Sequence, residues 1–303
     1  MPNRGLTRWD YALLAVLTAS SFSLRLPLFN LFPVYRGDEL GENLRALAIA
    51  KGLILPLTNN AEFIGALYNY LVALAYLVKP GMETSRLLVV TTGSLTTPTL
   101  YLLTLKLTGS RLKSTLASLA LAFSPAHVLV SSHVAWSASL SPLLLTASLF
   151  FLVKGLREGG WGLFLFGLTA GLALQAHPST IASYAAFLAS WTLLVERGLF
   201  GNLLKRALLW IPGFALGYSN MIVFNVVKPF ESILAVFKAP WTGLHRTPTL
   251  AEYLRRLVFI SVEYGSMTMS GIPIIPLRYL VRTASFYVYL ALATALVAYA
   301  LAR

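Results

Sequence analysis

Two adjacent acids, Asp38 and Glu39, are the side chains in this sequence best placed to do chemistry. They follow the first apolar segment, and Asp38 is one of only two aspartates in the 303 residues. The other, Asp10, lies at the edge of the N-terminal apolar run. A scarce acid beside a membrane indicates a functional carboxylate, because charged groups near lipid are costly to keep. The alternative is that Asp38 only caps a helix.

The composition identifies lipid as the main solvent of the chain. Hydrophobic residues make up 57% of the sequence, charged residues make up 12%, and the mean hydropathy is +0.71. These values are typical of a polytopic membrane protein, and we expect an all-α fold. The absence of cysteine excludes a disulfide, a thiolate nucleophile and a cysteine metal site, so carboxylates, histidines and hydroxyls are the available chemistry.

Nine apolar segments approach the length of roughly 17 to 25 residues that a helix needs to cross a hydrocarbon layer. They are Tyr11–Leu24, Phe63–Val78, Leu87–Leu105, Thr115–Val130, Val134–Val153, Trp161–Ala176, Ile181–Val195, Ala207–Phe224 and Phe286–Leu301. We expect about eight transmembrane helices, with amphipathic helices at the interface, in a single membrane domain of residues 1–303. The basic N-terminus and the apolar run after it indicate an uncleaved signal anchor.

Positive charge is in excess, with 24 Lys and Arg against 11 Asp and Glu. The cations are scattered among loops between apolar segments rather than gathered on a soluble face, which argues against nucleic acid as a partner. The predicted partners are instead the lipid bilayer, with its anionic headgroups, and lipid phosphates.

Loop charges orient the spans, because short loops rich in Lys and Arg tend to stay cytoplasmic. Four basic segments are therefore predicted to lie inside, namely the N-terminus and residues 106–113, 154–157 and 197–206. Strict alternation of every span cannot place all four inside, so one apolar segment must not cross. We assign this role to Phe63–Val78, whose tyrosines and Asn69 favour the interface. A complete crossing there, with another segment re-entrant, stays open.

On this assignment the chain has two external regions, residues 25–86 and 225–284. A transmembrane ladder over 87–224 separates them, and a last helix over 285–303 follows. The first region contains an amphipathic helix predicted over Leu40–Lys51, lying flat on the membrane with its Leu and Ala face apart from Glu42 and Arg45. Asp38 and Glu39 stand near the N-terminus of this helix, where the helix dipole and free N–H groups stabilise negative charge.

The second external region is rich in cations, against the positive-inside tendency. Either this region is cytoplasmic, or its arginines hold an anion, because guanidinium groups fit phosphate oxygens. We predict that Arg246, Arg255 and Arg256 bind a lipid phosphate, and snorkelling to lipid headgroups is the alternative for each. A second interfacial helix is predicted over Pro248–Ile260.

A divalent metal ion is a candidate cofactor. Glu62, His133 and His177 all fall on the predicted outer side, and they offer the oxygen and nitrogen ligands that such an ion binds. No local ligand spacing such as His-x-x-x-His is present. Histidines that cap helix ends at the interface are the alternative.

Short motifs over residues 9 to 200 resemble the integral-membrane glycosyltransferases of the GT-C fold. The matching branch contains the protein O-mannosyltransferases and the aminoarabinose transferases of lipid A. The matching stretches are Arg25-Leu-Pro, Asp38-Glu39, residues 45–56, residues 65–71, Ser85-Arg86-Leu, and residues 119–125 leading to Ser131-Ser-His133. As in that family, a first span is followed by an external loop with an Asp-Glu pair, an amphipathic helix and a ladder of spans.

The resemblance implies a transferase that moves a sugar from a polyprenyl-phosphate carrier to a protein or glycolipid acceptor, with inversion at the anomeric carbon. The reaction would take place at the outer face of the plasma membrane. Asp38 would be the catalytic base, with Glu39 beside it. The chain departs from the family between Glu83 and Glu158, where it has no acid although many members carry a second one. His133 is the candidate substitute.

Two other classes of function stay open. One is a transporter or flippase for a polyprenyl lipid or a sugar, although nearly all charges lie at the ends of the spans and we find no internal repeat. The other is a non-catalytic GT-C-like membrane subunit, because the missing second acid is consistent with lost activity.

Overall fold

The computed structural model describes residues 5–29, 37–194 and 199–238, together with 249–252, 254–255 and the single residues 291 and 295. Within these residues every regular element is a helix, apart from one isolated antiparallel bridge between Thr58 and Gly65. The predicted all-α class is therefore confirmed for the described part of the chain. The last predicted span, Phe286–Leu301, lies outside it except for residues 291 and 295.

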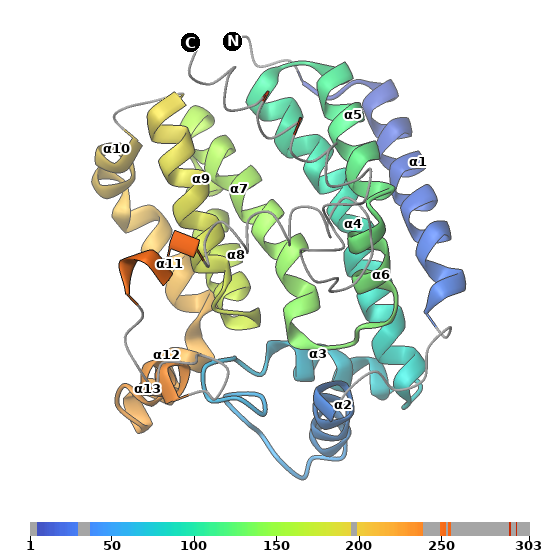
Figure 1. The fold of residues 1–303 in the computed structure, drawn as a ribbon, viewed down its shortest axis with the longest axis vertical. Coiled ribbons are helices and arrows are strands. Elements are labelled where there is room, and N and C mark those ends of the chain that lie inside the picture. Colours follow the sequence, from blue (N-terminus) through green and yellow to red (C-terminus); the bar gives the residue numbers. More distant parts are fainter. Residues whose placement is uncertain are drawn as a thin grey trace.

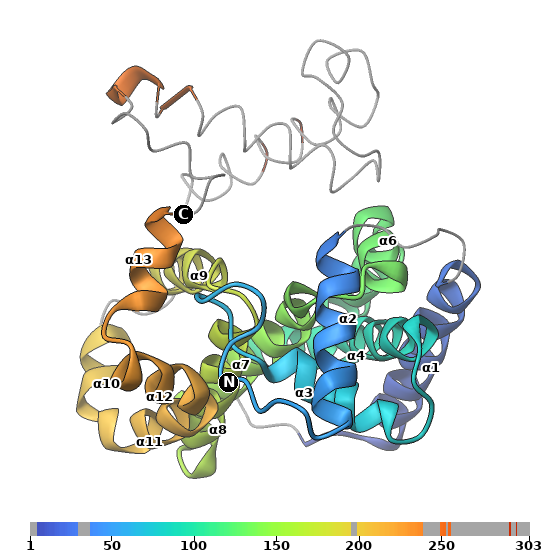
Figure 2. The ribbon, with the colours of Figure 1, turned by 90° about the horizontal axis from the view of Figure 1, so that it is seen from below.

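The helices differ strongly in length, from short turns to one of 27 residues. In chain order they are α1 Arg8–Arg25, η1 Leu26–Leu28, α2 Gly37–Ala50, α3 Leu67–Tyr76, α4 Met82–Thr108, α5 Arg111–Ala122, α6 Pro125–His133, η2 Ser137–Leu140, α7 Ser141–Glu158, α8 Trp161–Ala176, α9 Thr180–Leu194, α10 Leu199–Lys205, α11 Ala207–Gly217, α12 Ser219–Val227 and α13 Glu231–Lys238. The long helices α1, α4, α7, α8 and α9 stand side by side, while α2, α3, α12 and α13 gather at one end of the bundle (Figures 1 and 2). We call this the α2 end.

Three helical segments are long and apolar enough to cross a membrane, namely Arg8–Leu28, Met82–Thr108 and Ser137–Glu158. Two bent pairs, Arg111–Ala122 with Pro125–Ser132 and Ala207–Gly217 with Ser219–Val227, raise the number to as many as five among the described residues. The prediction of a membrane protein is thus supported in outline. The count of about eight spans stays a prediction.

Two of the predicted spans, Thr115–Val130 and Ala207–Phe224, correspond to the bent pairs. The first breaks before Pro125, which begins α6 and bends the pair by 57°. Proline cannot donate the hydrogen bond that would continue the preceding helix, so the chain changes direction there. The second pair bends by 73° after Gly217.

The helix within the predicted segment Phe63–Val78 is too short to cross a bilayer. It is α3, with ten residues. At 1.5 Å per residue it is about 15 Å long, half of the hydrocarbon thickness of about 30 Å. Residues 63–66 before it belong to the loop that carries the Thr58–Gly65 bridge. This length agrees with the prediction that the segment does not cross.

Glycines bring α8 and α11 into close contact. A Cβ atom on Gly167 would lie 1.9 Å from the Trp210 carbonyl oxygen, and one on Gly213 would lie 2.2 Å from the Phe164 carbonyl oxygen. Only the absence of a side chain allows the two backbones to approach this closely, as in many membrane helix pairs. Beside this contact, Leu152, Leu163 and neighbouring apolar side chains form a buried cluster.

The four basic segments that were predicted to share one side of the membrane lie together at the end of the bundle opposite α2. Arg111 donates to both oxygens of Asp10, at 2.8 and 2.9 Å. Lys106 pairs with Glu158, and Arg206 Nη1 donates to the Gly155 carbonyl oxygen at 3.3 Å. This end holds eight described cations, Arg8, Lys106, Arg111, Lys113, Lys154, Arg157, Lys205 and Arg206, and two acids, Asp10 and Glu158.

Charge at the α2 end is nearly balanced. Its described residues include seven cations, Arg25, Arg45, Lys51, Lys79, Arg86, Lys228 and Lys238, and six acids, Asp38, Glu39, Glu42, Glu62, Glu83 and Glu231. The prediction that the α2 end is extracytoplasmic was made from these same charges, so it stays a prediction.

Candidate functional site

Helix α2 turns polar as well as apolar residues toward the bundle, and Ala46, Leu47 and Ile49 belong to an apolar cluster there. Glu39, Glu42 and Asn43 are buried, whereas Leu40 and Leu44 are 44% and 57% exposed. The helix predicted over Leu40–Lys51 is confirmed, and its flat position on a membrane stays a prediction. Its buried polar residues meet hydrogen-bonding groups of the loop before α3, of α3 and α4, and of η2.

Asp38 stands in the first turn of α2 with an exposed side chain. No hydrogen bond or ion pair of its carboxylate is found within the described part of the chain. The first N–H groups of a helix point toward its N-terminus and favour negative charge there. Asp38 is therefore an accessible carboxylate on a helix that the neighbouring acids fix to the bundle.

Glu39 is paired with Arg86 of α4. Arg86 Nε donates to Glu39 Oε1 at 2.8 Å and Nη2 donates to Oε2 at 3.2 Å, while Nη1 donates to the Phe29 carbonyl oxygen at 3.1 Å. The two side chains are only 5% and 2% exposed. Glu39 was predicted to take part in catalysis beside Asp38. Its carboxylate is bonded to Arg86, and the pair fixes the start of α2 to the start of α4. A part for Glu39 in catalysis stays a prediction.

Glu42 is the second buried acid of α2, one turn after Asp38. Its carboxylate accepts hydrogen bonds from the Ser137 hydroxyl at 2.9 Å, from the Ser137 N–H at 3.1 and 3.2 Å, and from Asn59 Nδ2 at 3.2 Å. Burial raises the pKa of Glu42 to about 7, and the charge of Asp38 adds to the increase, although the bonds from Ser137 and Asn59 oppose it.

Other polar contacts complete the attachment of α2. Asn43 Nδ2 donates to the Glu39 carbonyl oxygen at 2.6 Å, and the Tyr76 hydroxyl of α3 donates to Asn43 Oδ1. Asn69 Nδ2 of α3 donates to the Glu42 carbonyl oxygen at 3.1 Å. Buried polar groups destabilise a fold unless they are hydrogen-bonded. The network therefore holds α2 in one position on α3 and α4.

Arg45 is on the same side of α2 as Asp38 and Glu42, two turns after Asp38. Its Nη1 donates to Asn60 Oδ1 at 3.0 Å, and its Nε is buried without a hydrogen-bond partner in the described structure. Two helical turns correspond to about 10 Å along the axis. Arg45 thus places a positive charge on the side of α2 that carries Asp38.

The predicted lipid-phosphate arginines are mostly outside the described structure. Arg246 and Arg256 lie outside it, and Arg255 is exposed in the short described stretch 254–255. Nothing in the described residues brings Arg255 into contact with Asp38. This binding site stays a prediction.

The predicted metal ligands are not brought together by the described residues. Glu62 Oε1 lies 3.6 Å from Lys228 Nζ, and His177 Nδ1 lies 2.7 Å from the Ser179 hydroxyl. His133 is the last residue of α6, and its side chain is outside the described structure. Among the described side chains, no group of three His, Asp or Glu is arranged to hold a metal ion. The metal site also stays a prediction.

A buried arginine lies deeper in the bundle, where α1 meets α6. Arg25 Nε donates to the Ser131 hydroxyl at 2.7 Å, and its Nη1 donates to the Ser21 carbonyl oxygen at 2.8 Å and to the Ser21 hydroxyl at 2.6 Å. Its Nη2 is buried without a partner in the described structure. Gly93 of α4 leaves room for this contact, because a Cβ there would lie 2.3 Å from Ser131 Cβ. Arg25 therefore joins α1 to α6.

The sequence prediction missed Glu42 and Arg86 as members of this cluster. Glu42 had a usable signal, because Glu39, Glu42, Asn43 and Ala46 fall on one side of a helix. The partners of these acids had no signal in the sequence, because Ser137 is 95 residues from Glu42 and Arg86 is 47 residues from Glu39.

No protein-family model matches this chain, and no curated protein matches it. A function therefore has to be inferred from the residues and their geometry.

Proposed function

We propose that this chain is a membrane glycosyltransferase that moves a sugar from a polyprenyl-phosphate carrier to an acceptor at the outer membrane face, with Asp38 as catalytic base. The observation that carries the proposal is the contrast among three acids on one helix. Asp38 is exposed and accessible, whereas Glu39 and Glu42 are buried and bonded to Arg86, Ser137 and Asn59. One carboxylate is available for chemistry, and the others support it.

The reaction requires the groups that this arrangement offers. A hydroxyl or amine of the acceptor attacks the anomeric carbon and forms the new bond, while the bond from that carbon to the phosphate oxygen breaks. The proton of the nucleophile passes to Asp38, and the electron pair leaves with the phosphate. A single displacement of this kind inverts the anomeric centre. Asp38 has to be held rigidly for such a transfer, because small misplacements reduce the rate strongly.

The departing lipid phosphate needs a cation. Arg45 can supply one on the Asp38 side of α2, and Arg246, Arg255 and Arg256 are the cations predicted from the sequence. A guanidinium group stabilises the negative charge that develops on the leaving oxygen.

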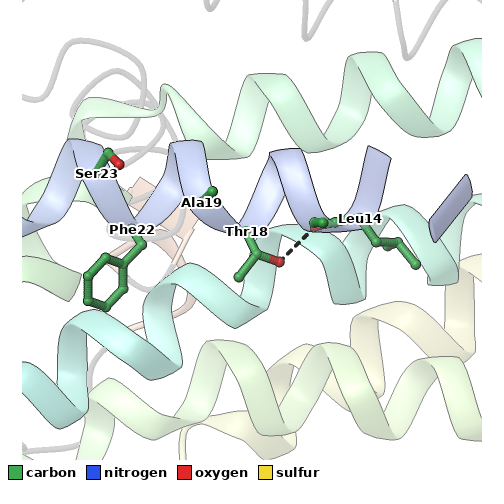
Figure 3. A pocket seen from close by; sticks show the side chains of 6 residues that line it. Leu14, Thr18, Ala19, Phe22 and Ser23 are labelled. Carbon is green, nitrogen blue, oxygen red and sulfur yellow. Dashed lines mark hydrogen bonds between the residues drawn. The ribbon is translucent and has the colours of Figure 1, made fainter. Parts of the chain in front are cut away.

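The prenyl chain of the donor needs an apolar surface. A shallow groove along α1, with a volume of about 590 Å³, offers one (Figure 3). It is lined by Leu14, Ala15, Thr18, Ala19, Phe22 and Ser23, and the Thr18 hydroxyl has a hydrogen-bond partner because it donates to the Leu14 carbonyl oxygen at 2.8 Å. Its Ser23 end lies toward the end of α1 that carries Arg25, at the α2 end of the bundle.

Reconstitution into vesicles tests the proposal. The purified chain is given short-chain polyprenyl phosphates that carry different radiolabelled sugars, together with peptide and glycolipid acceptors, and both released polyprenyl phosphate and labelled product are measured. Stoichiometric release and product formation are expected for at least one donor. Movement of the donor between leaflets without product would instead establish a flippase. Absence of both would leave a non-catalytic subunit and would overturn the proposal.

Glu83→Gln is the matched control in this assay. Glu83 is an acid of the α2 end whose side chain is 56% exposed and which forms an i,i+4 pair with Lys79. Its loss is expected to leave the transfer rate unchanged, so a general effect of removing negative charge at this end can be separated from the effect of Asp38.

A further inference from the structure

Glu42 has an environment unlike that of its neighbour Glu39, because within the described residues no cation contacts its carboxylate. Its hydrogen bonds come from Ser137 on η2 and from Asn59 in the loop 57–66. One acid thus joins three segments that are distant in the sequence. These segments are α2, the loop before α3, and the connection between α6 and α7.

The groups around Glu42 are arranged as donors. Asn59 Oδ1 accepts the Ala61 N–H at 2.7 Å, which turns its Nδ2 toward Glu42. The Ser137 N–H can only donate. The Ser137 hydroxyl is the one group in this set that can reverse its direction. Such a shell fits an ionised carboxylate, whereas a protonated Glu42 must turn the Ser137 hydroxyl round to accept its proton.

Asp38 lies one helical turn before Glu42, and residues four apart on a helix are neighbours with about 5–6 Å between their Cβ atoms. The charge of Asp38 is among the causes that raise the pKa of Glu42, after burial.

We propose that Glu42 is a positioning residue for Asp38 that acts through its charge. When ionised, Glu42 accepts hydrogen bonds from the loop 57–66 and from η2, and these bonds fix the turn of α2 that carries Asp38. When protonated, it turns the Ser137 hydroxyl round, so the contact that holds this turn changes. This inference rests on the proposed function, because the role of Asp38 as base comes from there.

The other titratable and charged groups near Glu42 do not offer a competing explanation. They are Asp38, Glu39 and Arg45 on α2, Tyr68 and Tyr76 on α3, and Arg86 on α4. Burial and the charge of Glu42 raise the pKa of Tyr68 well above its usual value, so this tyrosine stays neutral near pH 7. Arg86 and Glu39 largely balance each other's charge. A change near neutral pH at this site therefore belongs to Glu42.

The pH dependence of sugar transfer tests the inference. The ionised fraction of a group that titrates at about 7 rises roughly tenfold from pH 6 to pH 8. The wild-type rate is expected to rise by about the same factor. Glu42→Gln is expected to be slower and to lack this rise. Ser137→Ala removes one hydrogen-bond donor to the ionised Glu42 carboxylate, so the transfer rate of this variant is expected to rise at a higher pH than that of the wild type.

Infrared difference spectra between about pH 6 and about pH 8 give a readout that does not depend on activity. The wild type is expected to show the carbonyl band of a protonated carboxyl group at the lower pH. Glu42→Gln is expected to lose this band, and Glu83→Gln to keep it. Asp38→Asn removes a repelling charge, so the titration of the band is expected to move to lower pH.

The possible outcomes separate this inference from the proposed function. If the wild type transfers no sugar but the band titrates as described, the proposed function fails while the electrostatic coupling stands. If transfer occurs and Glu42→Gln has the pH profile of the wild type, the role of Glu42 is wrong and the proposed function survives. A band that does not move in Asp38→Asn would also overturn the inference.

Discussion

The buried pair of Glu39 and Arg86 leads to a quantitative prediction about what fixes the helix that carries Asp38. Replacing Glu39 by Gln keeps the shape of the side chain but leaves the Arg86 guanidinium, 5% exposed, without its countercharge. Two unit charges about 3.5 Å apart attract each other by ~5 kcal/mol at an effective dielectric constant of about 20. Removal of one partner of a buried pair typically costs about 3–5 kcal/mol. We expect Glu39→Gln to lower the free energy of unfolding by about that amount.

The exposed pair of Lys79 and Glu83 is the internal control for this prediction. Its N···O distance of 3.0 Å is close to the 2.8 Å of the buried pair, but its side chains are 71% and 56% exposed. Water and salt screen such a pair, so Glu83→Gln should cost at most about 1 kcal/mol. If the N···O distance alone set the pair energy, Glu39→Gln and Glu83→Gln would lose similar amounts of stability. If burial sets it, Glu39→Gln should lose much more.

Equilibrium unfolding in mixed detergent micelles, followed by tryptophan fluorescence, measures both losses. A double-mutant cycle with Glu39→Leu and Arg86→Met separates the pair energy from the packing of each side chain. The double variant should be more stable than the sum of the single losses implies, because neither charge is left alone. A loss for Glu39→Gln no larger than that of the Glu83 control would refute the claim that this pair anchors α2.

Three further predictions address the site, its protonation and its orientation. Gly65→Ala places a Cβ atom 1.9 Å from Gln175 Cγ, so it should destabilise the chain by more than about 1 kcal/mol, and Gln175→Ala should relieve most of this loss in thermal unfolding. The pKa of Glu42 rises from 4.5 in the unfolded chain to about 7 in the folded chain. Between these two pH values the folded chain holds a proton that the unfolded chain has lost, so the free energy of unfolding should fall as the pH rises from 4.5 to about 7. That fall should be absent in Glu42→Gln. Since the sequence has no cysteine, single cysteines at Glu62 and Lys113 can be labelled in intact cells with an impermeant maleimide, and only the first should react; labelling of Lys113→Cys alone would reverse the orientation.

Local patterns in the sequence predicted the helical elements well. The spacing of apolar residues placed a helix over Leu40–Lys51, and the structure has α2 over Gly37–Ala50. Gly167 and Gly171 are small residues of a kind that allows close helix contact, and both lie against α11. Such features depend on neighbouring residues only, so a single sequence contains them.

The polarity of α2 could not be predicted in the same way. Leucines on one side of a helix indicate an apolar face, but they do not show which polar residues of the helix become buried. Here the partners are Arg86, Ser137 and Asn59, which are far from α2 in the sequence. The bends at Pro125 and Gly217 were missed because hydropathy alone extends an apolar run through them.

The role of Asp38 in proton transfer is tested most directly by comparing sugar transfer by Asp38→Asn with that of the wild type in the same vesicles. Asparagine keeps the size of the side chain but cannot take a proton from the acceptor. Removal of a general base typically costs a factor of about 10² to 10⁴ in rate, so the variant should transfer sugar at least about a hundredfold more slowly, with unchanged thermal unfolding. A folded Asp38→Asn protein that retains the wild-type rate would contradict the proposal that Asp38 is the catalytic base.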